Sequence, residues 1–243
     1  MALPTRIETV ELGRFHSPID AMVLPGLVFI HDVWGPSDHS RDLAVELSGE
    51  GFGVLEIDLY RGHGDEPIED PGHQIRSLVD SEIVADLEAG ADWLKTESSV
   101  CGGQAVGVVG VCMGGTFAFL AACQSDRFSA AAPFYGILSY DEGLIAGPDG
   151  RDFTRKAVSP IEAASGLRTP LLASFGGKDT FVPDEHVEAL EAGLAASDVV
   201  FEIDRYPDAG HAFLNRTRED AYHAEASRAA WARVTHFLHD RLD

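Results

Sequence analysis

Short apolar runs alternate along the chain with segments in which apolar residues recur every three or four positions. The runs are rich in β-branched residues, as in strands buried on both faces, and they lie at 27–31, 53–58, 106–111, 128–136, 171–175 and 199–206. The periodic segments have the spacing of amphipathic helices and lie from 37 to 50, from 77 to 96, directly after 112, from 184 to 194 and from 218 onward. This alternation predicts right-handed crossovers and an α/β fold, with helices on both faces of a mostly parallel sheet.

Three other stretches are less regular. Residues 1–24 alternate weakly between apolar and polar and predict one or two edge strands. Residues 59–72 are rich in turn formers and predict a long surface loop. The stretch 137–164 is punctuated by glycine and proline and is longer than a compact domain needs. We interpret it either as a lid over a site or as a solvated insertion.

The length and charge of the chain limit what it can bind. Its 243 residues fit a single α/β domain spanning 1–243, with no internal repeat or linker. With 18 basic and 40 acidic side chains the formal charge is −22, and a field of that sign repels nucleic acids and anionic membranes. We therefore expect neither as a partner. An anionic small molecule would need local arginines to bind.

The cysteines and the N-terminus indicate the compartment. The first residues lack the apolar segment of a secretion signal, and no apolar run approaches the length of a membrane span. Cys101, Cys112 and Cys123 are odd in number and lack the spacing of metal ligands. These features predict a cytoplasmic protein without structural disulfides or a bound metal.

The most informative segment is the apolar run at 106–111, which breaks at Cys112 and continues with helical character. Gly110, Gly114 and Gly115 flank the cysteine where any Cβ would crowd a strand-to-helix turn. This pattern is the Gly-x-nucleophile-x-Gly elbow, which projects its central side chain at the carboxyl end of a sheet. A lone cysteine in such a place is more often a small buried hydrophobe, so its partners decide the interpretation.

Two later strands end in residues that complete a catalytic triad. The strand at 171–175 is followed by a Gly-Gly turn and Asp179, and the strand at 199–206 by a loop with His211. Nucleophile, acid and base thus occur in the order used by α/β-hydrolases. A helix N-terminus favours the thiolate of Cys112, His211 can act as general base and then as general acid, and Asp179 can hold the imidazole tautomer.

These motifs resemble those of the dienelactone hydrolases, a family of the α/β-hydrolase superfamily. The matching segments are Gly-Val-Cys-Met-Gly-Gly at 110–115, Gly-Gly-Lys-Asp-Thr-Phe-Val-Pro at 176–183 and Ala-Gly-His-Ala-Phe at 209–213. The similarity extends from about residue 27 to the C-terminus. It implies an α/β-hydrolase fold and a carboxymethylenebutenolidase-like enzyme that opens a small lactone or ester without a cofactor.

The resemblance also implies roles for the loop after the first buried strand. The oxyanion hole of the superfamily combines the backbone N–H after the nucleophile with one from this loop, here those of Met113 and Val33. The family usually has a glutamate in this loop that interacts with the resting thiol. Asp32 is one methylene shorter, so we expect this contact to be weakened or lost.

Four further residues are candidates for substrate contact. Trp34 shares the loop of Val33, and Tyr135 ends a strand where the family often has an aromatic near the site, with a core role as the alternative. Family members that act on dienelactone bind its carboxylate with arginines, one of them four residues after the histidine. This chain has Asn215 there, followed by Arg216, and Arg76 is a second candidate. A surface position is the alternative for both arginines.

The leading interpretation is a hydrolase in which Cys112 forms a covalent thioester with the acyl group of a small lactone or ester. The alternative is a non-catalytic or regulatory member that binds a small ligand in the same pocket. A nucleotide-binding protein is disfavoured because the glycines at 107–115 do not form the Gly-x-Gly-x-x-Gly fingerprint. The sequence leaves open the substrate, its charge and the oligomeric state.

Overall fold

The computed structural model describes residues 3–20, 23–61 and 67–243. Its strands are β1 Thr5–Val10, β2 Gly13–Pro18, β3 Gly26–Ile30, β4 Gly53–Ile57, β5 Val106–Val111, β6 Ala130–Phe134, β7 Leu171–Gly176 and β8 Phe201–Tyr206. Its helices are α1 Asp38–Gly49, α2 Pro71–Ser77, α3 Asp80–Thr96, α4 Met113–Gln124, α5 Gly143–Ala146, α6 Pro160–Ala163, α7 Asp184–Leu194 and α8 Ala224–Leu242, with a 3-10 turn η1 at Ala164–Gly166.

Within the described residues the strands form one eight-stranded sheet in the order β1-β2-β4-β3-β5-β6-β7-β8. From β4 to β8 neighbouring strands are parallel, whereas β1 pairs with β2 and β2 with β4 in antiparallel fashion. The predicted α/β class with a mostly parallel sheet is confirmed. The carboxyl ends of β3, β5, β7 and β8 share one edge of the sheet, where the loops after them meet.

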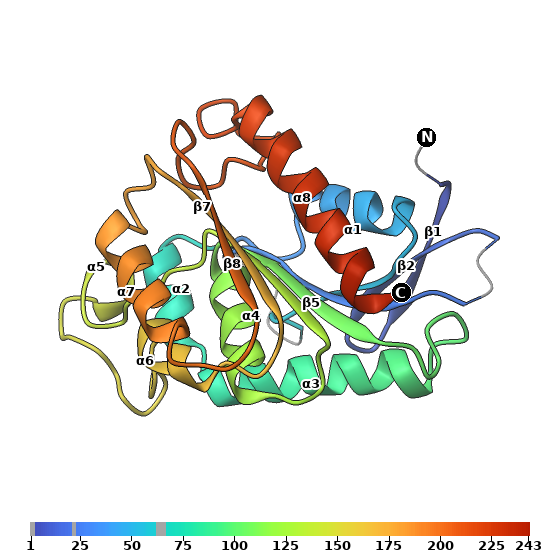
Figure 1. Ribbon diagram of the computed structural model, residues 1–243, viewed down its shortest axis with the longest axis horizontal. Helices are drawn as coiled ribbons and strands as arrows, with labels where there is room; N and C mark the ends of the chain where they lie inside the picture. The colour runs from blue at the N-terminus through green and yellow to red at the C-terminus, as the bar shows by residue number, and fades with distance from the viewer. Residues whose placement is uncertain (1–2, 21–22, 62–66) are drawn as a thin grey trace.

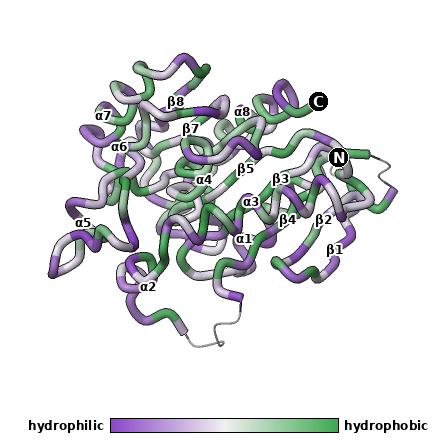
Figure 2. Tube along the Cα trace, turned by 90° about the horizontal axis from the view of Figure 1, so that it is seen from below, coloured by the Kyte–Doolittle hydropathy of each residue, from purple (hydrophilic) through white to green (hydrophobic). Residues whose placement is uncertain are grey.

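Helices cover both faces of the sheet (Figure 1). On one face α1 and α8 pack on a core that includes Leu43 and Val234, and on the other α3 and α4 pack on a core that includes Leu87 and Phe117. Helix α4 is apolar all round, as buried helices are, and each of its residues before Gln124 is buried. Figure 2 shows hydrophilic stretches on outer segments such as α2, α5 and α7.

Two predicted boundaries were wrong. Helix α2 begins at Pro71, two residues before the predicted end of the loop, because Asp70 caps it by accepting from the His73 N–H and Pro71 fits its first turn. Part of that predicted loop, 62–66, lies outside the described residues. The last helix begins at Ala224 and not near 218, since the His223 side chain caps it by accepting from the Ala226 N–H.

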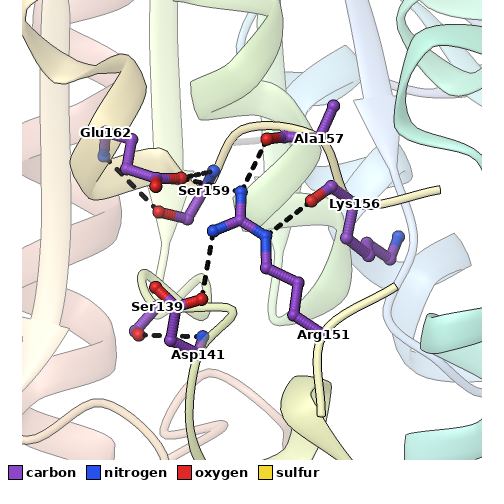
Figure 3. Close-up of polar contacts among 7 residues, drawn as sticks. All are labelled: Ser139, Asp141, Arg151, Lys156, Ala157, Ser159 and Glu162. Atoms are coloured by element: carbon purple, nitrogen blue, oxygen red, sulfur yellow. Dashed lines mark hydrogen bonds and ion pairs between the residues drawn. The ribbon is translucent and has the colours of Figure 1, made fainter. Parts of the chain in front are cut away.

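The stretch 137–164 is held together by a buried guanidinium (Figure 3). The Arg151 side chain is only 2% exposed and donates to the carbonyls of Lys156 and Ala157, each at 2.7 Å. It also contacts the carboxylates of Asp141 at 3.2 Å and Glu162 at 2.8 Å. These charge-assisted hydrogen bonds join residues near both ends of the stretch 137–164.

The same stretch is fastened to helix α3 by a second buried cation. Lys156 Nζ lies 2.6 Å from Asp80 Oδ1, and both side chains are buried. Burial lowers the pKa of Lys156 and raises that of Asp80. The lid role predicted for 137–164 stays a prediction, and any opening would have to separate this pair.

Across 3–20, 23–61 and 67–243, no helix has both the length and the apolar character that crossing a membrane would require.

Candidate active site

Cys112 stands alone between β5 and α4, in the turn that the glycine pattern predicted. Its φ of 54° and ψ of −118° are rarely adopted by residues with a side chain and mark a strained backbone. A Cβ on Gly110 would collide with the Gly114 carbonyl, and one on Gly114 with the Ile30 carbonyl. The Cys112 N–H donates to the Phe134 carbonyl at 3.0 Å, which anchors the turn to β6.

Three side chains that are far apart in sequence come together at this turn. His211 Nε2 lies 3.1 Å from Cys112 Sγ, and His211 Nδ1 lies 2.8 Å from Asp179 Oδ2. Asp179 is held in turn, because its Oδ1 accepts from the N–H groups of Phe181 at 2.8 Å and Val182 at 3.2 Å. The order thiol, imidazole and carboxylate is the geometry of a nucleophile, a base and a group that orients the base.

The electrostatics of this row favour a protonated imidazole. Burial alone would lower the pKa of His211, but the negative charges of Cys112 and Asp179 and their hydrogen bonds raise it to about 10. The site thus places a proton donor beside the Cys112 sulfur.

The loop after β3 brings Val33 close to the start of α4. The N–H of Met113 is the first of that helix and has no acceptor within it. The Tyr60 hydroxyl bridges the two segments, since it lies 3.0 Å from the Val33 carbonyl oxygen and 3.3 Å from Met113 Sδ. The sequence analysis missed Tyr60, which lies just after β4 in the turn-rich stretch.

Asp32 and His31 in the same loop have different surroundings. Asp32 is 6% exposed, and burial raises its pKa to about 6 although the Trp34 N–H donates to its carboxylate at 2.9 Å. His31 is fully buried, with Nε2 accepting from the Leu59 N–H and Nδ1 lying 2.6 Å from the Asp32 carbonyl oxygen. These bonds fix His31 as a neutral ring that shapes the loop.

Aromatic side chains surround the imidazole. Tyr135 is buried with a φ of 39°. Its ring packs edge to face with that of His211, with the two ring centroids 5.2 Å apart. The Phe181 ring also packs on His211, with the two ring centroids 5.0 Å apart. The Phe181 residue is 48% exposed to solvent, and Trp34 is 50% exposed. Phe181 was not predicted, although it stands two residues after Asp179 in the motif that carries the acid.

The two predicted arginines are engaged elsewhere. Both terminal nitrogens of Arg216 contact the carboxylate of Glu46 on α1. Arg76 donates to the Leu144 carbonyl at 2.7 Å and so joins α2 to the stretch 137–164. Asn215 is buried, and its Oδ1 accepts from Thr217, which shapes the loop after the histidine.

A different arginine lines a cavity that also includes the histidine. This cavity of about 390 Å³ is lined by His211, Arg218, Lys178, Tyr222 and His223, and also by the carboxylates of Asp208 and Asp220. Arg218 pairs with the exposed carboxylate of Asp220, at 2.8 Å. The positive charge of Arg218 also lowers the pKa of Asp32 slightly against the larger effect of burial.

The remaining cysteines lie apart from this chemistry. Cys101 and Cys123 are buried, and burial raises the pKa of Cys101 to about 11 and that of Cys123 to about 12. Among the described residues no group of three or more histidine, cysteine or acidic side chains is placed to hold a metal ion.

Known proteins are similar to this chain in both sequence and fold. The model of the dienelactone hydrolase family matches residues 13–242. An Escherichia coli K12 protein named "Putative carboxymethylenebutenolidase" is 32% identical over 218 residues, which is 87% of this chain and 75% of that protein. A Bradyrhizobium protein named "Probable 2-oxo-3-(5-oxofuran-2-ylidene)propanoate lactonase" is 25% identical over 231 residues, 94% of this chain and 88% of that protein.

A solved structure extends this similarity to three dimensions. The crystal structure named "Putative Dienelactone Hydrolase" from Klebsiella pneumoniae matches with a TM-score of 0.84 at 25% identity, and the match covers 98% of this chain and 99% of that one.

Proposed function

The chain belongs to the dienelactone hydrolase family and is a carboxylic ester or lactone hydrolase, and from that premise we propose that Cys112 is its nucleophile. The observation that carries the proposal is the row of short contacts from Cys112 Sγ to His211 Nε2 at 3.1 Å and from His211 Nδ1 to Asp179 Oδ2 at 2.8 Å. The strained elbow supports it further, because strain of this kind persists where function requires it.

The first half of the proposed reaction acylates the thiol. The Cys112 thiolate attacks the carbonyl carbon of the substrate, and the carbonyl π electrons move to oxygen. The N–H groups of Val33 and Met113 stabilise that oxyanion, each by about 3 kcal/mol in systems of this kind. As the C–O bond breaks, the His211 imidazolium gives its proton to the departing alkoxide. In a lactone that alcohol stays attached to the acyl group.

The second half releases the acid. The neutral imidazole of His211 takes a proton from a water molecule, whose oxygen attacks the thioester carbonyl. The C–S bond then breaks, and the thiolate returns to its place beside the imidazolium. Asp179 stabilises the imidazolium, while its bonds from Phe181 and Val182 keep it in place.

The proposed substrate is an unsaturated lactone that carries a carboxylate. The names of the two relatives both describe lactonases for compounds of this type. Trp34 and Phe181 offer exposed aromatic surface to a conjugated ring. The cation that best suits the carboxylate is Arg218, which lines a cavity with His211, whereas Arg216 is paired with Glu46.

Purified protein assayed on lactones and p-nitrophenyl esters tests this function. We expect hydrolysis by the wild type and none above background by Cys112→Ala, with Cys101→Ala and Cys123→Ala active. Equal turnover by wild type and Cys112→Ala would reject Cys112 as nucleophile. Saturable binding of a lactone without hydrolysis would favour the alternative of a non-catalytic ligand-binding member.

A further inference from the structure

Strand β1 forms one end of the sheet, and no strand in the described part of the chain pairs with its outer edge. Its one neighbour in the strand order is β2, with Thr5 opposite Pro18 and Val10 opposite Gly13. Residues 6–9 are all exposed. An open edge of this length is a template on which another strand can pair.

The backbone groups of every second residue in β1 point away from the sheet. The Ile19 N–H donates to the Pro4 carbonyl at 2.9 Å, which places Pro4 on the side bonded to β2. Bonded and non-bonded positions alternate along an antiparallel pair. Thr5, Ile7 and Thr9 therefore direct their N–H and C=O groups outward, where a further strand would meet them.

The sequence of this edge is complementary to itself in the reverse direction. It reads Thr-Arg-Ile-Glu-Thr at 5–9. In an antiparallel pair of two copies centred on Ile7, each Arg6 faces Glu8 of the other copy, and each Thr5 faces Thr9. Registers centred one residue away would instead place Arg6 opposite Arg6 or Glu8 opposite Glu8, and like charges in that position are destabilising.

Apolar side chains around the edge would lose solvent exposure on pairing. Ile7 is 46% exposed, and Leu3 and Ile19, which flank the ends of β1 and β2, are 50% and 57% exposed. Ile7 would pack on Ile7 of the second copy at the centre of the pair. Removing such surface from water favours association.

We propose that two copies of this chain associate by antiparallel pairing of their β1 strands, centred on Ile7. The pair gains about six backbone hydrogen bonds from the outward groups of Thr5, Ile7 and Thr9 in both copies. Two Arg6–Glu8 pairs set the register. A chain with a formal charge of −22 repels its own copies over most of its surface, so the complementary charges of this edge select where the copies meet.

Sedimentation velocity over a wide range of protein concentration, at physiological salt, tests the proposal. The wild type should show a monomer–dimer equilibrium. Arg6→Glu should weaken the dimer by at least about tenfold, because carboxylates then face each other at both ends of the pair. Glu8→Arg should also weaken the dimer, because two arginines then face each other at each of these places. The double variant Arg6→Glu/Glu8→Arg restores opposite charges at both places and should restore the dimer.

Two controls separate this edge from general effects. Ile7→Pro removes an outward N–H without removing a bond to β2 and should also weaken the dimer, whereas Arg228→Glu on the exposed side of α8 should not. Circular dichroism and ester hydrolysis should be unchanged in all variants, because β2, β4 and β3 separate β1 from β5 and Cys112. A protein that is monomeric at every concentration, a dimer that Arg6→Glu leaves intact, or a double variant that stays monomeric would overturn the proposal.

Discussion

The Tyr60 hydroxyl lies 3.0 Å from the carbonyl oxygen of Val33 and also reaches the sulfur of Met113. One side chain thus ties together the two segments whose N–H groups we assign to the oxyanion hole. Because the Tyr60 hydroxyl donates its hydrogen to the Val33 carbonyl, we assign Tyr60 a positioning role and not a direct contact with the substrate.

Tyr60→Phe should lower kcat for ester hydrolysis about fivefold to tenfold, the worth of one net hydrogen bond of about 1 kcal/mol. Alkylation of Cys112 by iodoacetamide forms no oxyanion, so its rate should stay close to the wild-type rate. Tyr206→Phe, whose hydroxyl lies 3.4 Å from Asp204, is the matched control and should leave both rates unchanged. Parallel losses of hydrolysis and alkylation would mean that Tyr60 supports the fold of the site and not the oxyanion hole.

Substrate charge can be assigned by comparing Arg218 with Arg216. Arg218→Ala should weaken binding of an anionic lactone about tenfold and that of its methyl ester little. We expect about a tenfold loss, the lower end of what a hydrogen bond to a charged group contributes, because the Arg218 side chain is half-exposed and water weakens the interaction. Arg216→Ala should affect both substrates equally, since Arg216 pairs with Glu46 and contacts Tyr222. If KM for the anionic lactone rises only in Arg216→Ala, the assignments are reversed.

Asp32 should make stability depend on pH. Its pKa is raised from the ordinary 3.8 to about 6, so the folded protein binds the proton more tightly than the unfolded chain. The stability gained from that proton is complete below pH 4 and lost as the pH rises through 6, at a cost of up to about 3 kcal/mol.

Asp32→Asn removes this cost and keeps an acceptor for the Trp34 N–H. Urea unfolding should therefore show the variant to be more stable than wild type at pH 8 and nearly equal to it at pH 4. Asp20→Asn, at an exposed turn, should show no such trend. A stability difference that is the same at both pH values would contradict the raised pKa of Asp32.

The pair of Lys156 and Asp80 should anchor the stretch 137–164. Lys156→Ala leaves a buried carboxylate without its cation and should lower the free energy of unfolding by about 3–5 kcal/mol. Lys178→Ala removes an exposed pair with Asp208 and should cost under about 1 kcal/mol. A Lys156→Ala enzyme of wild-type stability would show that the stretch is not fastened here and would favour its interpretation as a mobile lid.

The strained turn at Cys112 and the meeting of Cys112, His211 and Asp179 could be predicted from the sequence, because local patterns encode them. Glycines around Cys112 are needed where a Cβ would meet backbone, and strands that end at one edge bring Asp179 and His211 to it. The role of Tyr60 depends on a contact with Met113, 53 residues away, which no local pattern carries. The pairing of Arg216 with Glu46 likewise depends on how α1 packs against a distant loop.

The most direct test of Cys112 as nucleophile is to trap the acyl group on the enzyme. A reaction with p-nitrophenyl acetate, quenched in acid during turnover and analysed by peptide mass spectrometry, should show an acetyl group on the peptide that contains Cys112. His211→Gln should retain that group longer, because deacylation lacks its base. Acetylation that is absent from Cys112 while p-nitrophenol is released catalytically, or that is found on another residue in amounts that account for turnover, would contradict the mechanism.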